Sequence, residues 1–234
     1  MTYNNIHKGI FISRPNRFIA EVEINGKIEV CHVKNTGRCK ELLIPGAVAY
    51  ANKADNSSRS TKYDLIAVEK AAKEGSLHVN IDSQAPNIAF GEYLRQGKFL
   101  ALGDITHIKA EAKYNTSRFD FYVETAAKKV FIEVKGVTLV ENGIAMFPDA
   151  PTERGIKHLN ELAACIAAGY DAYVVFIIQM EEAHISHFTP NYKTHAAFGD
   201  TLAKVMGMGV NIMAFGCKVT PDSMTINNQV PVKL

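Results

Sequence analysis

The sequence lacks any apolar run long enough to cross a membrane and any closely spaced cysteine pair. A membrane helix requires about 20 consecutive apolar residues, and no stretch of these 234 residues approaches that length. The amino-terminal segment MTYNNIHKGI also lacks the charged and apolar regions of a secretory signal. The four cysteines form no CxxC pair, which argues against a zinc ribbon or a disulfide framework. We therefore expect a cytoplasmic protein with reduced thiols and no membrane partner.

An excess of either charge is missing as well. Lysine and arginine number 26 against 24 acidic residues, which gives a formal net charge of +2. This balance is too mild to identify a nucleic-acid-binding protein, and it does not exclude one. With 47% hydrophobic and 21% charged residues, the composition is globular and argues against disorder or a coiled coil. Function must therefore be inferred from motifs.

The first third of the chain has the pattern of short strands separated by turns. Apolar and charged residues alternate over 18–24, Asn25-Gly26 predicts a tight hairpin turn, and 27–33 is the expected partner strand. Further strands are predicted at 47–53, 62–70 and 76–81. Several short strands within residues 1–84 predict a small closed or nearly closed β-barrel domain, with the OB fold as one candidate.

The pattern changes after residue 84, where helices alternate with strands. Helices are predicted at 86–98, 152–168 and 195–207, and strands at 107–114, 118–124, 129–137, 171–179, 210–216 and 219–227. Pro151 and Gly169 flank the second helix in the expected asymmetry. The nearly all-apolar strand after it is typical of one buried on both faces of a sheet. Residues 85–234 are therefore expected to form a mixed-sheet α/β domain.

Two acids and a lysine stand out in this second domain. If strands 118–124 and 129–137 form a hairpin, Asp120 lies opposite Glu133, and Lys135 shares the face of Glu133. Like charges at that spacing repel unless a cation lies between them. We therefore expect Asp120 and Glu133 to bind Mg²⁺ or Mn²⁺, with Lys135 orienting a water or stabilising a phosphate. The plainer alternative is three surface charges with an incidental salt bridge.

Neighbouring residues favour the functional interpretation. Both strands are otherwise apolar, the preceding helix supplies Glu92, and the following helix begins with Arg154, Lys157 and His158 on neighbouring positions of one face. Beside a carboxylate site these cations would suit a phosphodiester, whereas alone they would be a solvated helix face. Together the residues resemble the PD-(D/E)xK nuclease core, in which the signature acids lie on a central β-hairpin.

Two turns offer further phosphate-binding candidates. The segment Asn35–Arg38, with Lys40 nearby, could present backbone amides and cations to a phosphate, or could be ordinary turn chemistry. The segment 147–154 precedes a helix start, where free N–H groups attract phosphate unless side chains cap them. The pair His184 and His187 resembles a metal pair, but no third ligand is in view.

Over its whole length the chain resembles the sugar fermentation stimulation protein A family. Four ordered segments carry the resemblance: HVKNTGR at 32–38, SRFDF at 117–121, EVKGVTL at 133–139 and FPDAPTERGIKHLNEL at 147–162. The resemblance implies an OB-like domain joined to a PD-(D/E)xK-like domain, non-specific DNA binding, and a regulatory role in sugar, particularly maltose, metabolism. The matching acids are Asp120 and Glu133, the matching lysine is Lys135, and Glu92 corresponds to the helix-borne acid of the nuclease pattern.

Two functions from different classes stay open. One is a DNA-binding protein with a nuclease-like metal site and a regulatory role; the other is an active metal-dependent deoxyribonuclease, and a small-molecule enzyme on a reused fold is a weaker third. In either DNA-related case the expected cationic contacts are Arg38, Lys40, Arg118, Arg154, Lys157 and His158. An exposed sheet edge could support a homodimer.

Overall fold

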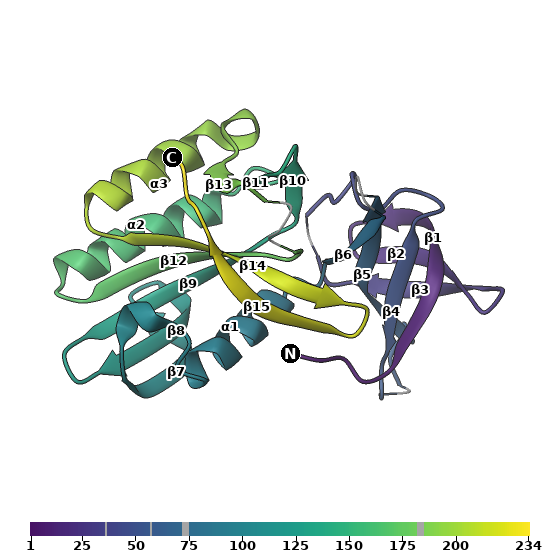
Figure 1. The fold of residues 1–234 in the computed structure, drawn as a ribbon, viewed down its shortest axis with the longest axis horizontal. Coiled ribbons are helices and arrows are strands. Elements are labelled where there is room, and N and C mark those ends of the chain that lie inside the picture. The colour runs from purple at the N-terminus through teal and green to yellow at the C-terminus, as the bar shows by residue number, and fades with distance from the viewer. Residues whose placement is uncertain (36, 57, 72–74, 182–184) are drawn as a thin grey trace.

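Two structural units follow one another along the chain and pack side by side, the first at one end of the molecule and the second at the other (Figure 1). The computed structural model describes residues 1–35, 37–56, 58–71, 75–181 and 185–234. Within these ranges no helix is both long enough and apolar enough to span a membrane.

The first unit is a β-barrel. Its strands are β1 (Ile6–Asn16), β2 (Ile19–Ile24), β3 (Lys27–Val33), β4 (Val48–Lys53), β5 (Tyr63–Ala71) and β6 (Ser76–Asn80). Antiparallel pairs join β1 to β2, β2 to β3, β1 to β4 and β4 to β5, and a parallel pair joins β3 to β5. These pairings close a ring of five strands. Strand β6 is not part of the ring and pairs antiparallel with β5. The predicted OB-like barrel is confirmed.

Local sequence explains the first hairpin of the barrel. Ala20, Val22 and Ile24 are buried at alternate positions of β2, so one face of the strand forms the barrel interior. Asn25 and Gly26 have φ angles of 53° and 74°, the left-handed values that a tight hairpin turn requires. The turn predicted from Asn25-Gly26 is therefore present.

The second unit is a mixed sheet between helices. Its elements are α1 (Ala85–Arg95), η1 (Leu100–Leu102), β7 (Ile105–Tyr114), β8 (Ser117–Thr125), β9 (Lys129–Val137), β10 (Leu139–Glu141), β11 (Ile144–Phe147), α2 (Glu153–Ala167), β12 (Asp171–Ile178), β13 (His187–Pro190), α3 (Tyr192–Gly207), β14 (Asn211–Thr220) and β15 (Ser223–Val230). The main sheet has the order β15-β14-β12-β9-β8-β7, with β9, β12 and β14 parallel. Helix α1 packs on one face and helices α2 and α3 on the other, so the predicted mixed-sheet α/β domain is confirmed.

Two features of this unit differ from the sequence prediction. Strands β10, β11 and β13 form a small second sheet that was not predicted, because strands of three or four residues carry too little periodicity to detect. At the carboxyl end, Cys217 and Lys218 lie inside β14, where a break between strands was predicted. The chain instead turns at Pro221-Asp222, a typical turn pair.

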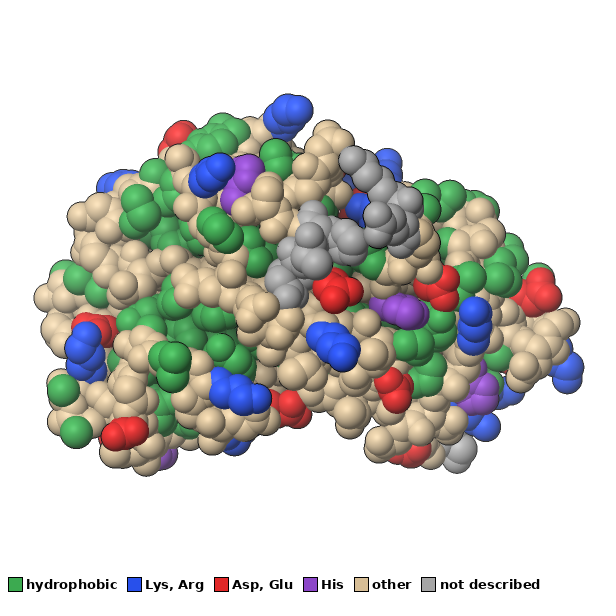
Figure 2. Space-filling view, viewed as in Figure 1, with side chains coloured by type: hydrophobic (Ala, Val, Ile, Leu, Met, Phe, Trp, Pro, Cys, Tyr) green, Lys and Arg blue, Asp and Glu red, His purple; other side chains and the backbone are tan. Residues whose placement is uncertain are grey.

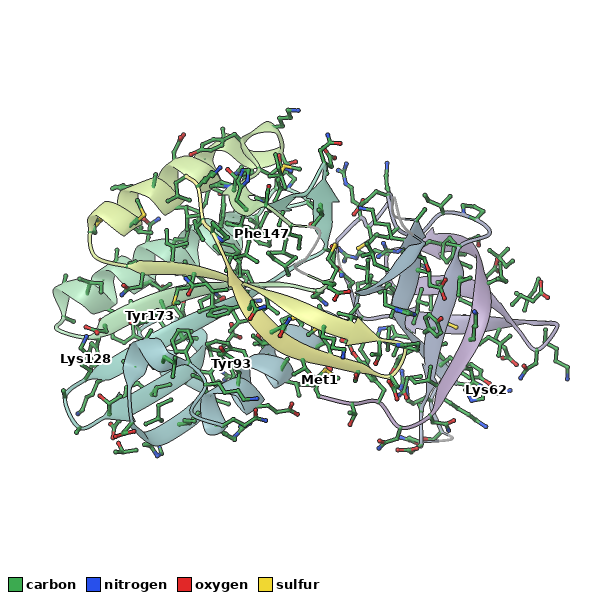
Figure 3. All side chains as sticks on the ribbon, in the orientation of Figure 1. Met1, Lys62, Tyr93, Lys128, Phe147 and Tyr173 are labelled. Atoms are coloured by element: carbon green, nitrogen blue, oxygen red, sulfur yellow. The ribbon has the colours of Figure 1, made fainter. Side chains whose placement is uncertain are left out.

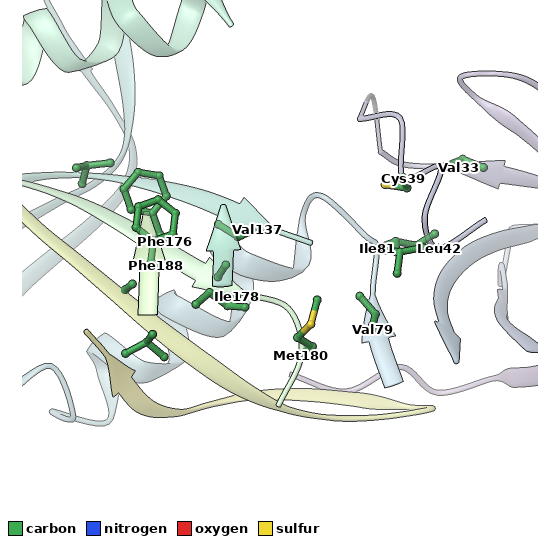
Figure 4. Packing of buried hydrophobic residues seen from close by; sticks show 14 of the residues in the cluster. Val33, Cys39, Leu42, Val79, Ile81, Val137, Phe176, Ile178, Met180 and Phe188 are labelled. Carbon is green, nitrogen blue, oxygen red and sulfur yellow. The ribbon is translucent and has the colours of Figure 1, made fainter. Parts of the chain in front are cut away.

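A continuous hydrophobic core joins the two units (Figure 4). Apolar side chains of the barrel and of the second unit belong to one buried cluster that crosses the junction, including Val33, Leu42, Val79, Ile81, Val137, Ile178 and Met180. Polar contacts run beside it: the Asn80 N–H donates to the carbonyl of Gln179 at 3.0 Å, and the Gln179 side-chain amide donates to Asn80 Oδ1 at 3.1 Å. The units are therefore fixed relative to each other.

Candidate active site

A cavity of about 520 Å³ lies where the barrel meets the second unit. Its lining includes the predicted acids and lysine on β8 and β9, residues of α1 and of the loop before α2, and two described residues of a barrel loop, Asn35 and Gly37. Residues from widely separated parts of the sequence thus share one cavity. Asp120, Glu133 and Lys135, which were predicted from the sequence as site residues, all line this cavity.

Asp120 occupies the point where β8 and β9 separate. Regular pairing runs from Glu124 opposite Lys129 to Phe121 opposite Ile132, which confirms the register predicted from the sequence. Beyond that pair, Asp120 Oδ2 accepts the backbone N–H of Val134 at 2.7 Å, in place of a strand-to-strand bond. Its other oxygen, Oδ1, accepts a hydrogen bond from the side chain of Asn87 at 2.7 Å. Both oxygens are held, so the carboxylate has a fixed orientation.

Glu133 is held by two cationic or donor side chains on one of its oxygens. Lys135 Nζ lies 2.6 Å from Glu133 Oε1, and His158 Nδ1 lies 2.5 Å from the same oxygen. Glu133 is only 3% exposed and His158 5%. The two strand residues share a face, as predicted from β-strand alternation, and His158 reaches them from α2.

The two acids have opposite electrostatic environments. Burial, followed by the negative charge of Glu133, raises the pKa of Asp120 to about 6. Burial alone would also raise the pKa of Glu133, but the hydrogen bond from His158 and the charge of Lys135 outweigh it and lower that pKa. Glu133 is therefore the ionised acid near neutral pH, and Asp120 changes its charge within the physiological range.

The remaining oxygen of Glu133 indicates what the site could bind. Within the described part of the chain, the buried Oε2 has no hydrogen-bond partner. An unpaired buried carboxylate oxygen is costly, and a cation is the partner that satisfies it best. Among the described residues, no three His, Cys, Asp or Glu side chains are placed so that together they could hold a metal ion. A cation here would have two protein carboxylates, Asp120 and Glu133, and would take its other ligands from backbone carbonyls, water or substrate.

Glu92 does not join this cluster. Its carboxylate lies 2.7 Å from the ammonium group of Met1, which also donates to the backbone carbonyl of Met224. Glu92 does not line the cavity, because five positions along α1 from Asn87 its side chain points to a different side of the helix, so the structure does not place this predicted helix-borne acid in the site. Sequence reasoning missed Asn87, the α1 residue that does reach Asp120; its signal was its place in the first turn of the predicted helix.

The predicted cations of α2 have separate positions. Arg154 is exposed, lines the cavity, and donates from Nε to His158 Nε2 at 3.4 Å. His158 is buried against Glu133, so it cannot contact DNA directly as predicted. Lys157 is exposed and pairs with Glu161 at 3.8 Å along its own helix. Arg118 is also exposed, with Glu111 at 3.7 Å, and neither lines the cavity.

The predicted phosphate-binding turns are already hydrogen-bonded in their described parts. The Gly37 N–H donates to Asn35 Oδ1 at 2.7 Å, and the Arg38 N–H donates to Asp149 Oδ2 at 3.0 Å. Before α2, Thr152 caps the helix by accepting the Gly155 N–H at 3.1 Å. These amides are therefore structural.

The two predicted cations of the barrel loop, Arg38 and Lys40, have exposed side chains. They are therefore free to meet a ligand at the surface. Thr36 and His184 lie outside the described residues, so the structure gives no account of the proposed His184 and His187 pair.

Comparison with known proteins agrees with this architecture. A family model described as the SfsA N-terminal OB domain matches residues 12–80, and one described as the sugar fermentation stimulation protein RE domain matches residues 84–223. A sugar fermentation stimulation protein homolog from Clostridium beijerinckii is 59% identical, and one from Desulfitobacterium hafniense is 57% identical, each over 234 residues. Those alignments cover 100% of this chain and 100% and 99% of the two relatives.

A solved structure from Pyrococcus furiosus is similar over the whole fold. It is described as SfsA in complex with Ca²⁺, is 28% identical, and superposes with a TM-score of 0.89 over 100% of this chain and 98% of that one. Both family models, the full-length relatives and the shared fold agree. This chain belongs to the sugar fermentation stimulation protein family.

Proposed function

We propose that this chain binds DNA without sequence specificity and hydrolyses its phosphodiester bonds with a divalent cation held by Asp120 and Glu133. The observation that carries the proposal is the buried Oε2 of Glu133, which has no partner in the described residues and lies beside an acid of raised pKa. Two acids and a lysine on neighbouring strands are the groups that a hard cation and a phosphate require. Glu41 and Glu161 also have a buried oxygen without a partner, but among these three glutamates only Glu133 lines the cavity, beside a second acid and a lysine.

Each side chain then has a defined role. A bound divalent cation would polarise a phosphoryl oxygen and lower the pKa of a bound water. Lys135, fixed by Glu133 at 2.6 Å, orients the attacking water or stabilises the charge that develops on the phosphate. Arg154, exposed where it lines the cavity, binds a phosphate oxygen. His158 is a positioning residue, because it contacts Glu133 from a buried position.

The identity of the cation is part of the proposal. The Pyrococcus furiosus relative is described in complex with Ca²⁺, which supports an oxygen-liganded divalent cation in this family. Mg²⁺ and Mn²⁺ take ligands of the same class, and carboxylates, carbonyls and water suit all three ions. We expect Mg²⁺ or Mn²⁺ to support the reaction in this chain.

DNA binding must come from local groups, because the surface has no strong overall charge. On the face seen in Figure 2, lysine and arginine side chains are interspersed with acidic ones over both units. The exposed cations Arg38, Lys40 and Arg154 are the expected phosphate contacts, and Arg154 lines the cavity. Binding through phosphates releases counterions, so affinity should fall steeply as salt concentration rises and should vary little with sequence.

DNA binding without hydrolysis is the second candidate. It is favoured by one observation, that Glu92 binds Met1 and supplies no third acid to the site. A protein that only binds DNA would fit a regulatory role, and the name of its family connects it with sugar fermentation. The acidic pair would then serve to hold a cation that bridges protein and phosphate.

Incubation of plasmid DNA, linear duplex DNA and linear single-stranded DNA with purified protein separates the two candidates, and cleavage of any one of these forms counts as hydrolysis. Reactions contain Mg²⁺, Mn²⁺ or EDTA and compare the wild type with Asp120→Ala, Lys135→Ala and a matched control, Lys129→Ala. Lys129 is an exposed lysine of the same strand that does not line the cavity. A gel-shift assay in EDTA at two salt concentrations measures binding independently of cleavage.

We expect cation-dependent cleavage by the wild type and by Lys129→Ala, with loss of cleavage but not of binding in Asp120→Ala and Lys135→Ala. Cleavage by Lys135→Ala at the wild-type rate would refute the role given to Lys135. Binding without cleavage in any cation would establish the second candidate. Binding that does not change between low and moderate salt would contradict phosphate-dominated recognition.

A further inference from the structure

The Glu133 side of the candidate site is a buried part of the cavity lining. Glu133 is 3% exposed, and its unpaired Oε2 is fully buried. A phosphate that approaches this oxygen must therefore enter the cavity itself. Hydrolysis beside so buried an oxygen requires the sugar-phosphate backbone to leave the molecular surface and pass between the cavity walls.

The cavity walls come from both structural units and contact each other. The Arg38 N–H of the barrel donates to Asp149 Oδ2 at 3.0 Å, across the junction. A Cβ atom added to Gly37 would lie only 2.5 Å from the same Asp149 oxygen, so the Gly37 backbone and the Asp149 side chain approach as closely as a glycine permits. One side of the cavity is therefore closed by direct contact between the barrel and the loop that precedes α2.

A single guanidinium holds the barrel wall in place. Arg14 Nη1 donates to the carbonyls of Gly37 and Arg38 at 2.9 and 2.7 Å. Its Nη2 donates to the carbonyls of Asn35 and Arg17 at 2.8 and 2.7 Å. Arg14 thus binds four backbone carbonyls and fixes the conformation of the barrel loop that forms this wall.

The size of the cavity limits what can enter. A volume of about 520 Å³ is within the range that holds one small molecule, which corresponds to a nucleotide or two. A phosphate of duplex DNA could enter only together with the second strand and the neighbouring base pairs, and these are too large for the cavity. Enzymes that act on a nucleotide inside a closed pocket take it from single-stranded substrate or extrude it from the helix.

The barrel offers a matching surface for an unpaired strand. Phe18 is 44% exposed, and the Arg17 guanidinium lies 4.6 Å from the centre of its ring. Exposed aromatic rings with neighbouring cations are the stacking platforms by which OB barrels bind single strands. Arg14 binds the carbonyl of Arg17 as well as that of Gly37, so one side chain connects this platform to the cavity wall.

We propose that the site accepts an unpaired DNA strand, either a single-stranded segment or a strand end, which the barrel guides past Phe18 into the cavity. This inference rests on the proposed function and specifies its substrate. Intact duplex DNA binds only at the surface and is not hydrolysed within its paired region.

The test compares DNA forms of one sequence in two separate measurements. Fluorescence anisotropy in EDTA gives the affinity for a labelled single strand, a blunt duplex, and duplexes with a 3′ or a 5′ overhang. Cleavage in Mn²⁺ is then followed on the same molecules and on covalently closed single-stranded and double-stranded circles. We expect the single strand to bind about tenfold more tightly than the blunt duplex, since stacking of one base contributes about that factor.

Matched variants test whether the DNA strand enters the cavity and passes along the barrel. Ala150→Trp fills the cavity from a lining position, and its control, Ala126→Trp, makes the same change in the β8–β9 loop. Figure 3 shows Lys128 of that loop at the end of the second unit away from the barrel. Ala150→Trp should lose single-strand cleavage while Ala126→Trp keeps it. Phe18→Ala, a surface change, should lose about tenfold in single-strand affinity with no change for the duplex.

The outcomes separate this inference from the function on which it rests. Equal affinity and equal cleavage of single-stranded and double-stranded DNA would overturn the inference and leave the proposed nuclease intact. Preferential binding of single strands without cleavage in any cation would support the inference and refute hydrolysis. Absence of binding to every DNA form would refute both. Unchanged single-strand affinity in Phe18→Ala would refute the path along the barrel, even if Ala150→Trp failed to fold.

Discussion

His158 donates its Nδ1–H to Glu133 Oε1 across 2.5 Å, although the two residues lie on different elements, α2 and β9. Its other ring nitrogen, Nε2, faces the Nε–H of Arg154 at 3.4 Å. Because an arginine N–H can only donate, Nε2 must accept, which places the ring proton on Nδ1. The orientation of Glu133 is thus fixed from a helix on one face of the sheet.

His158→Ala should weaken cation binding at the site by about 10- to 100-fold, as expected when a residue that orients a ligand is removed. His158→Asn should restore much of the affinity, because the amide nitrogen of asparagine replaces the Nδ1 donor of histidine. Titration with Mn²⁺ by calorimetry measures the affinity of both variants, and circular dichroism shows whether they fold. Equal affinities in His158→Ala and the wild type would mean that the histidine serves packing alone.

The raised pKa of Asp120 makes both stability and cation binding depend on pH. The native carboxyl, with a pKa of about 6 against an ordinary 3.8, is favoured in its protonated form, so its ionisation above pH 6 costs stability. Asp120→Asn, which stays neutral, should therefore be more stable than the wild type at pH 8 by about 3 kcal/mol. The difference should shrink as pH falls from 6 towards 4. Urea unfolding in EDTA at several pH values measures it.

An exposed acid provides the control for this experiment. Asp104→Asn makes the same chemical change at an exposed position and should leave the pH profile unchanged. In the wild type, the affinity for Mn²⁺ should fall about tenfold per pH unit below 6, because the cation must displace one proton. A stability difference between Asp120→Asn and the wild type that does not vary with pH would contradict the assignment.

Much of the site could be predicted because its signals are local. Alternation places Glu133 and Lys135 on one face, and the loop length alone sets Glu124 opposite Lys129. That register placed Asp120 opposite Glu133, and both acids do line the cavity. The α2 helix was equally predictable, because its apolar spacing and the capping Thr152 are both encoded within a few residues.

The rest depends on contacts between distant segments. Phe119 packs near His158 on the α2 face, whereas Phe121 packs against Phe90 of α1 on the other face, so side-chain alternation breaks at Asp120. Sequence periodicity cannot reveal such a break. Nor can it show that the barrel residue Gly37 reaches the site, since that follows from the packing of two domains.

Gly136 links the site to the domain junction, and an added methyl group there should disturb both. A Cβ at this position would lie 2.5 Å from Gln179 Oε1 and 2.9 Å from Pro86 Cγ. The Gln179 amide cannot move away freely, because it donates to Asn80 Oδ1 and to the carbonyl of Asp82, each at 3.1 Å. We expect Gly136→Ala to lose about 1–3 kcal/mol of unfolding free energy by overpacking and to reduce cleavage more than the loss of folded protein explains.

Gly207→Ala is the matched control for Gly136→Ala. No atom lies within 4 Å of its added Cβ, and the residue is the last of α3. Its stability should equal or slightly exceed that of the wild type, because alanine is the better helix former. Thermal unfolding and cleavage assays on the two variants test the prediction. Wild-type stability in Gly136→Ala would show that the junction can adjust to the methyl group.

Asp64 should stabilise the barrel at neutral pH and lose that effect in acid. It is 3% exposed, with Arg59 Nη2 at 2.6 Å and Lys34 Nζ at 3.1 Å. Burial would raise its pKa, but these two cations outweigh burial and lower the pKa to about 2. Because the folded value lies below the ordinary 3.8, the stabilisation is complete above pH 4 and disappears as pH falls towards 2.

Asp64→Asn should accordingly be about 2 kcal/mol less stable than the wild type at pH 7, with a gap that narrows between pH 4 and pH 2. Asp55→Asn, an exposed position of the same domain, should match the wild type throughout. Urea unfolding monitored by circular dichroism at pH 7, 4 and 3 gives the comparison. A gap of constant size across this range would show that the Asp64→Asn variant loses packing or hydrogen bonds rather than charge, because only the ionised carboxylate responds to acid.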